Sequence, residues 1–190
     1  MARVRKNLLI RGLTGSVGDQ FVIKTTRSGK TIISNKPEFD EDREFTEPQV
    51  AQQSVFTKAT IFAKKAQHQP FYQENWPGKA TSAYNMAMSD YLKKPEILDI
   101  DITEWNGRIG EPIYIMAVDN VKVARVRVII LPNSEDNDAL DGGLAAESEY
   151  NGLSWVFTAT KNVELAPGMQ IDAYVYDMAN NLTKESLVLS

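Results

Sequence analysis

Residues 112–131, with the sequence PIYIMAVDNVKVARVRVIIL, decide the fold class of this 190-residue chain. Apolar side chains occupy every second position on one face of each half of the stretch: Ile113, Ile115 and Ala117, then Val126, Val128 and Ile130. Arg125 and Arg127 fall on the opposite face of the second half. Alternation with a period of two is typical of a strand with one buried face. The stretch therefore predicts two β-strands.

The same alternation continues through the C-terminal half of the chain. Further strands are predicted at residues 97–102, 153–160, 169–177 and 182–189. In the second of these, Trp155, Phe157 and Ala159 lie on one face, and we expect Trp155 in the core. Six or seven short strands in about 95 residues, with turn signals between them, indicate an antiparallel β-sandwich.

The N-terminal half combines a hairpin with helices. Residues 21–26 and 31–34 are β-rich and flank a short glycine-containing turn, which predicts a β-hairpin. Thr46 and Gln49 form a capping-box pattern before a helix at 46–67, and a second helix is predicted at about 79–93. We expect an antiparallel helix pair packed on the hairpin. The fold is therefore predicted to be mixed and mainly β, with a hairpin-plus-helix unit at 1–95 and a sandwich at 96–190.

The C-terminal half resembles bacterial immunoglobulin-like domains. Residues 115–128 resemble that family's alanine-x-aspartate turn and the valine-rich strand after it. Residues 171–183 resemble a second family turn, in which Asp177 and Asn181 match and Asn180 replaces the usual glycine. Asparagine tolerates the left-handed backbone that such a turn requires. The resemblance implies an immunoglobulin-like sandwich used for adhesion, spacing or assembly.

The N-terminal half is similar to uncharacterised proteins of Bacteroidota and their phages. The shared pattern has a glycine-x-x-glycine start, a glycine-lysine hairpin turn, a lysine-proline exit and a glutamine-rich helix. Here these are residues 15–18, 29–30, 36–37 and 49–53. This resemblance implies no activity.

Charge is segregated along the chain, although the formal net charge is only −4. Residues 1–36 hold eight Lys or Arg and one acid, which gives +7, and residues 96–190 hold six bases and sixteen acids, which gives −10. One interpretation of this pattern is solvated faces that keep the protein soluble. A second is head-to-tail association, in which the basic end of one copy contacts the acidic end of another. Nucleic-acid binding by the basic segment is a third interpretation, against which the acidic half argues.

The residue inventory removes several classes of chemistry. The chain has no cysteine, and therefore no disulfide, thiol nucleophile or cysteine-based zinc site. Its single histidine, His68, is expected at the end of the first helix, where the helix dipole favours it. Gly12, Gly15 and Gly18 precede a predicted strand, whereas a dinucleotide-binding loop opens a helix, so we expect turns and a bulge there.

Two groups of acidic residues are the candidate sites for catalysis or metal binding. Asp99 and Asp101 share a strand face, but no second element supports a glycosidase pair, and we expect no enzymatic activity. A calcium site in a sandwich loop is a further hypothesis. The loop does not match an EF-hand, because it lacks the glycine and one of the oxygen ligands that an EF-hand requires. The alternative is a solvated loop. The candidate calcium ligands are Asp136, Asp138, Asp141 and Glu147.

No segment has the pattern of a secretory signal or of a transmembrane helix. We expect synthesis in the cytoplasm without a signal peptide. The final site, whether cytoplasm, virion or cell exterior, stays open.

These observations favour a structural subunit that assembles with itself into a filament, tube or virion-like homopolymer. The basic hairpin of one copy would contact the acidic immunoglobulin-like domain of another, and a donated hairpin could extend a sheet edge. The alternative is a non-enzymatic module that binds glycan or another protein. The predicted interface residues are Arg3, Arg5, Lys6, Arg11, Phe21, Ile23, Lys24 and Trp76.

Overall fold

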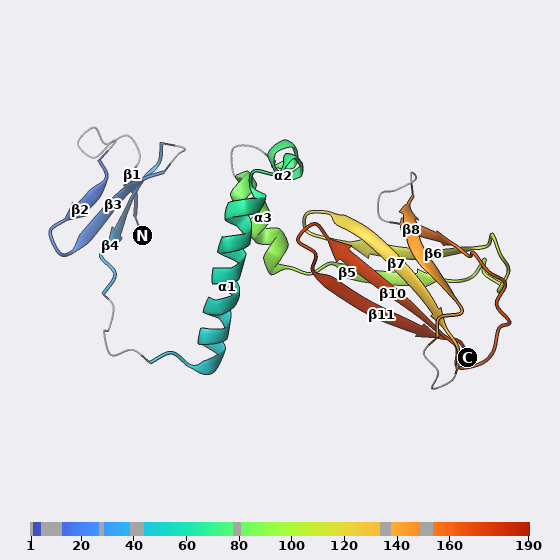
Figure 1. Cartoon of the computed structure of the whole chain (residues 1–190). Coiled ribbons are helices and arrows are strands. Elements are labelled where there is room, and N and C mark those ends of the chain that lie inside the picture. Colours follow the sequence, from blue (N-terminus) through green and yellow to red (C-terminus); the bar gives the residue numbers. More distant parts are fainter. Residues whose placement is uncertain are drawn as a thin grey trace. The chain divides into compact units, whose positions relative to one another are not determined.

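The chain divides into two compact units, Met1–Glu47 and Pro48–Ser190, both drawn in Figure 1. The computed structural model describes residues 2–4, 13–26, 29–38, 44–77, 81–133, 138–148 and 154–190. The helices therefore fall in one unit with the C-terminal strands, whereas the sequence analysis grouped them with the hairpin and placed a boundary after residue 95.

The first unit contains a four-stranded antiparallel sheet in the order β1-β4-β3-β2. Its strands are β1 (Ala2–Val4), β2 (Gly15–Val17), β3 (Phe21–Thr25) and β4 (Thr31–Asn35). Strands β3 and β4 form the predicted hairpin, and Gly29 supplies the positive φ of 76° in its turn. Strand β1 was not predicted. Among the described residues of this unit only Ile23 and Thr31 are buried.

Three helices follow: α1 (Glu47–Ala66), α2 (Pro70–Asn75) and α3 (Ala83–Leu92). Helix α1 begins directly after Thr46, as its sequence pattern predicts. The sequence pattern does not predict the short α2, because Pro70 interrupts the helical pattern there, although proline also suits the first turn of a helix. Helix α3 begins after Ser82, whose side chain accepts a hydrogen bond from the Asn85 backbone N–H (3.2 Å).

Helix α1 packs over its C-terminal half only. Ala59, Ala63 and Ala66 are buried. Ala63 and Ala66 belong to a small cluster with Tyr72 and two alanines of α3, Ala83 and Ala87. Val55, predicted on the same face, is 42% exposed, and every residue of the first three turns is exposed. The small alanines allow α1 to approach its neighbours closely.

The C-terminal seven strands form an antiparallel sandwich in the order β11-β10-β7-β8-β9-β6-β5. The strands are β5 (Glu96–Asp101), β6 (Pro112–Val118), β7 (Val123–Leu131), β8 (Asp141–Glu147), β9 (Ser154–Thr158), β10 (Gln170–Asp177) and β11 (Leu182–Val188). Six of these strands are predicted from alternation in the sequence. The mainly-β fold is confirmed.

Strand β8 corrects the sequence-based prediction, which has a loop at these residues. Its first part pairs with β7 and its last two residues pair with β9, so it joins the two layers of the sandwich. Its sequence, DGGLAAE, is poor in the β-branched and aromatic residues that indicate strands. The glycines are explained by crowding: a Cβ at Gly142 would lie 2.8 Å from the Val128 carbonyl oxygen, and one at Gly143 would lie 3.2 Å from the Phe157 ring.

The core lies between the two layers. Trp155 is buried there, as predicted, together with the inward residues of β6, β7, β9 and β10. The largest of the fully buried side chains in this core are Phe157, Ile113, Ile115, Ile130, Met169 and Ile171.

The turn after β10 connects the sandwich to the helices. Asn180 has a positive φ of 67°, so the expected left-handed asparagine is confirmed. The Asn181 side-chain amide donates to the backbone carbonyl oxygens of Asp90 (2.9 Å) and Lys93 (3.2 Å), and Thr183 Oγ1 donates to the Pro95 carbonyl (2.5 Å). These bonds hold the end of α3 against the sandwich.

Candidate interaction surface

One outer face of the sandwich is acidic. It is formed by β5, β6 and β9, which are neighbours in the sheet. The three strands contain Glu96, Asp99 and Asp101 and no lysine or arginine. A bulge between Ile97 and Asp99 shifts the register of β5, so that Asp99 lies opposite Met116 and Asp101 lies opposite Tyr114.

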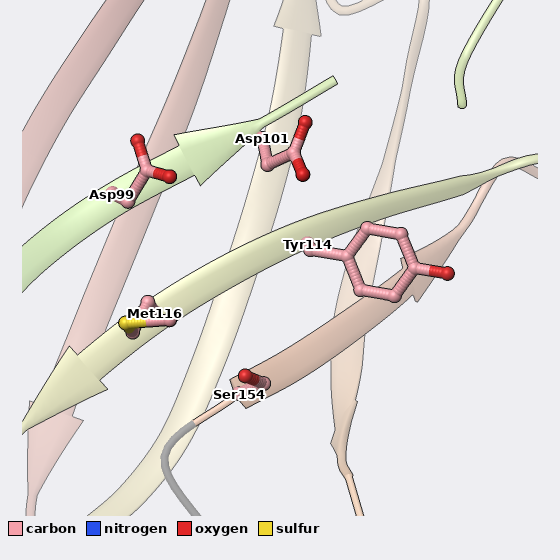
Figure 2. Close-up of a pocket in the computed structure, with 5 residues that line it drawn as sticks. All are labelled: Asp99, Asp101, Tyr114, Met116 and Ser154. Atoms are coloured by element: carbon pink, nitrogen blue, oxygen red, sulfur yellow. The ribbon is translucent and has the colours of Figure 1, made fainter. Parts of the chain in front are cut away.

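The acidic face is hollowed. Asp99, Asp101, Tyr114, Met116 and Ser154 line an open depression of about 250 Å³. Figure 2 shows these five side chains, which come from three adjacent strands. The wall of the depression therefore combines two carboxylates, an aromatic ring, a thioether and a hydroxyl.

Hydrogen bonds keep part of this face ionised. The Asp101 carboxylate accepts hydrogen bonds from the hydroxyl and the backbone N–H of Thr103, and these bonds lower its pKa. The Tyr114 hydroxyl donates to Glu104 Oε2 (3.0 Å). A carboxylate that holds its charge beside apolar walls suits contact with a cation on an apolar stem, which is the chemistry of a lysine side chain.

The opposite outer face carries cations and tyrosines. Arg125 lies 4.2 Å from the Tyr176 ring centroid and donates from Nη2 to Asn180 Oδ1 (2.7 Å). Lys184 lies 5.4 Å from the Tyr174 ring centroid, and Arg127 lies opposite Tyr174 on β7. We call this surface the Arg–Tyr face; its residues are Arg125, Arg127, Tyr174, Tyr176 and Lys184.

A buried carboxylate anchors the Arg–Tyr face. Asp172 is 1% exposed and accepts hydrogen bonds from Gln170 Nε2 (2.6 Å), Ser186 Oγ (2.6 Å) and the Tyr174 hydroxyl (3.2 Å). Lys184 Nζ lies 2.7 Å from its Oδ2. Burial opposes ionisation of Asp172, but these partners outweigh it and lower its pKa. Lys184 is therefore held in place on the surface.

The basic residues predicted for the N-terminal interface fall mostly outside the described residues. Arg5, Lys6 and Arg11 lie outside them, and of Arg3 only the backbone, in β1, is described. Lys24 lies on β3 and is exposed.

The predicted apolar interface residues have different surroundings. Phe21 is 43% exposed beside a hollow of about 530 Å³ that includes the Lys36–Asp19 salt bridge (2.9 Å). Ile23 is buried, 6% exposed, and offers little surface to a partner. Trp76 follows α2 and is 38% exposed.

The candidate calcium ligands do not come together among the described residues. Asp136 lies outside them, and Asp138 is exposed. Asp141 and Glu147 stand at opposite ends of β8, about 20 Å apart for six residues of strand. The Asp141 carboxylate already accepts hydrogen bonds from the backbone N–H groups of Thr160 (2.7 Å) and Lys161 (3.1 Å). Within the part of the chain that the structure describes, no group of three or more His, Cys, Asp or Glu could hold a metal ion.

His68 and the glycines occupy the places that the sequence predicts. His68 lies in the turn after α1 and is exposed. Gly15 and Gly18 have positive φ, and Gly18 belongs to the turn between β2 and β3, with no helix after it. Gly12 lies outside the described residues.

The sequence does not predict the Arg–Tyr face or the depression. It did place Arg125 and Arg127 on one strand face, and Tyr174 and Tyr176 on another. Which strands are neighbours decides whether these residues meet, and alternation does not contain that information.

Comparisons with known proteins add little. No protein-family model matches the chain, and no curated protein matches it. Among the solved structures to which the chain is similar is one described as the crystal structure of CopC from Methylosinus trichosporium OB3b, at 13% sequence identity and a TM-score of 0.35. The match covers 50% of this chain and 90% of that one. Among the described residues, the structure contains no helix with the length and apolar character needed to cross a membrane.

Proposed function

We propose that this chain is a structural subunit that assembles with itself into a homopolymer: a filament, a tube or a virion-like shell. The basic N-terminal unit of one copy contacts the acidic sandwich of the next. Such a head-to-tail contact uses two different surfaces, so it builds an open chain unless it closes into a ring.

The observation that carries this proposal is the small amount of core in the described part of the N-terminal unit. Its described part buries only Ile23 and Thr31, while Leu13, Val17 and Phe21 are 50%, 54% and 43% exposed. A sheet of short strands with so little buried apolar surface needs further packing for stability. A neighbouring copy would supply that packing.

The acidic face gives the contact its second side. Asp99 and Asp101 lie in a depression without a basic residue in the three strands that form it. The N-terminal segment carries a net charge of +7 over residues 1–36, from eight bases and one acid. Complementary charge of this kind accelerates association and fixes orientation.

Charge reversal on the acidic face tests the proposal. The Asp99→Lys/Asp101→Lys variant should form much smaller species than the wild type at low salt, whereas the wild type should form larger species as its concentration rises. Sedimentation velocity measures both, and negative-stain microscopy shows the form of the assembly. Glu164→Lys/Glu185→Lys is the matched control, because it makes the same charge change at exposed acids outside the depression.

Two results would contradict the proposal. One is a wild-type chain that stays monomeric at high concentration and low salt. The other is a control variant that loses association as fully as the variant of the depression. A monomer that binds glycans on an array would favour the alternative, a non-enzymatic binding module.

A further inference from the structure

We propose that the Arg–Tyr face binds the acidic segment at residues 38–44 of a second copy of this chain. The inference rests on the proposed self-assembly and adds a second contact to it, on the opposite side of the sandwich from the acidic depression.

The Arg–Tyr face has the composition of a binding surface. Arginine and tyrosine are among the residues most enriched in the side chains that dominate binding energy. The Arg127 side chain has no hydrogen bond or ion pair among the described residues, so its charge is available to a partner. Leu144 lies opposite Arg127 and is 70% exposed, and Leu182 lies opposite Tyr176 and is 39% exposed. Apolar surface therefore borders the cations.

The face is also arranged before any partner arrives. Arg125 is held by the Tyr176 ring and by Asn180 Oδ1. Lys184 is held by the buried Asp172. Side chains that are already ordered lose less conformational entropy on binding. With three cations and one buried carboxylate, the local charge is about +2, and the matching ligand is anionic.

The segment at residues 38–44, EFDEDRE, has matching charge and matching period. Acids occupy positions 38, 40, 42 and 44, and position 41 is a fifth acid. In an extended chain these four alternate positions point to one side at steps of about 6.6 Å. Arg125 and Arg127 are two residues apart on one strand and repeat at the same step. Of this segment only Glu38 and Glu44 belong to the described residues, and both are exposed.

An extended acidic strand lying across this face would thus place successive carboxylates near successive cations. The acidic sheet of a second copy is a less suitable occupant, because its carboxylates lie in the hollow that the proposed function assigns to the basic unit. The regular spacing of its acids makes the segment at residues 38–44 a better match for this face than a polyanion without such spacing.

A labelled peptide of residues 37–46 tests the inference by fluorescence polarisation against the full-length protein. We expect binding at 50 mM salt that weakens at 300 mM, because exposed charges are screened. Arg127→Glu should weaken binding by about tenfold or more. Lys161→Glu, which makes the same charge change outside the Arg–Tyr face, should leave affinity within about twofold of the wild type.

A second peptide provides the control for charge. It carries Glu38→Gln, Asp40→Asn, Asp42→Asn and Glu44→Gln, and it should bind at least about tenfold more weakly. Near-ultraviolet circular dichroism of Arg127→Glu checks that the sandwich remains folded.

The outcomes separate this inference from the proposed function. If the chain self-associates but the acidic peptide does not bind, or binds Arg127→Glu as well as the wild type, the inference is overturned and the assembly proposal stands. If the neutral peptide binds equally, the inference is overturned as well. If the peptide binds as expected while the chain sediments as a monomer, the assembly proposal and the second-copy occupant both fail.

Discussion

Asp90 is a carboxyl group without solvent contact at the junction of helices and sandwich. Its Oδ2 accepts a hydrogen bond from the Tyr72 hydroxyl (2.6 Å), and its Oδ1 has no partner among the described residues. The pKa of Asp90 is raised to about 7, mainly by burial; the hydrogen bond from Tyr72 lowers it, and the charges of Asp177 and Asp119 add to the rise. The folded chain therefore binds the Asp90 proton more tightly than the unfolded chain does.

This residue predicts a pH dependence of stability. Because the folded-state pKa lies above the unfolded value of 3.8, the contribution of Asp90 to the free energy of unfolding falls as pH rises from about 4 to about 7. The full change is at most about 4 kcal/mol. Asp90→Asn removes the titration, so this variant should gain stability relative to the wild type between pH 5 and pH 8, as measured by urea unfolding.

Asp172 provides the opposite sign for comparison. Its pKa is lowered, so it stabilises the fold above its unfolded pKa, and that stability is lost as pH falls through the lower, folded-state value. Asp172→Asn should therefore lose most stability at neutral pH.

Equal pH profiles for the wild type and Asp90→Asn would contradict the assignment of a raised pKa to Asp90.

At the scale of elements, β8 separates what alternation can predict from what it cannot. Strands β6 and β7 can be predicted from the sequence, because apolar residues, mostly isoleucine and valine, occupy every second position on one face. Strand β8 does not, since glycine and alanine fill the positions where its backbone approaches β7 and the Phe157 ring. Close packing selects small residues there, and small residues carry no hydrophobic period.

Strand β8 also predicts the effect of a single methyl group. In Gly142→Ala the new Cβ would lie 2.8 Å from the Val128 carbonyl oxygen and 3.2 Å from Ile129 Cα, so the backbone of one strand must move. We expect a loss of about 1–3 kcal/mol in the free energy of unfolding, measured with urea. Ala146→Ser, at an exposed position of the same strand, should change it by less than about 0.5 kcal/mol. Equal stability of the two variants would show that this crowding is relieved at no cost.

At the scale of the whole molecule, the two units differ in the hydrophobic core that each contains. The second unit has a continuous core between two sheet layers and a smaller cluster around the helices. The first has two buried residues in its described part. We therefore expect the second unit to account for most of the free energy of unfolding, and the first unit to contact other copies of the chain.

Deleting residues 1–36 tests this division. The shortened chain should keep the near-ultraviolet circular dichroism of the tryptophans buried in the sandwich, Trp105 and Trp155, with a thermal midpoint within a few degrees of the wild type. It should form smaller species than the full chain does under the same conditions, because the contact made by the basic unit is lost. A shortened chain that unfolds would show that the first unit is part of the fold instead.

The sequence by itself determined the local elements of this protein. The hairpin, the start of α1, six sandwich strands, the core position of Trp155 and the left-handed Asn180 follow from periodicity, capping and turn chemistry, which are properties of neighbouring residues. The division of charge along the chain follows from the sequence as well.

Only the tertiary structure decided which distant residues meet. Strand order set Arg125 and Arg127 beside Tyr176 and Tyr174, and the bulge in β5 set Asp99 and Asp101 against Met116 and Tyr114. The tertiary structure also separates Asp141 from Glu147, which are close in sequence, because they lie at opposite ends of the extended strand β8. The physical reason is that alternation fixes the face on which a residue lies, whereas pairing between strands fixes its neighbours.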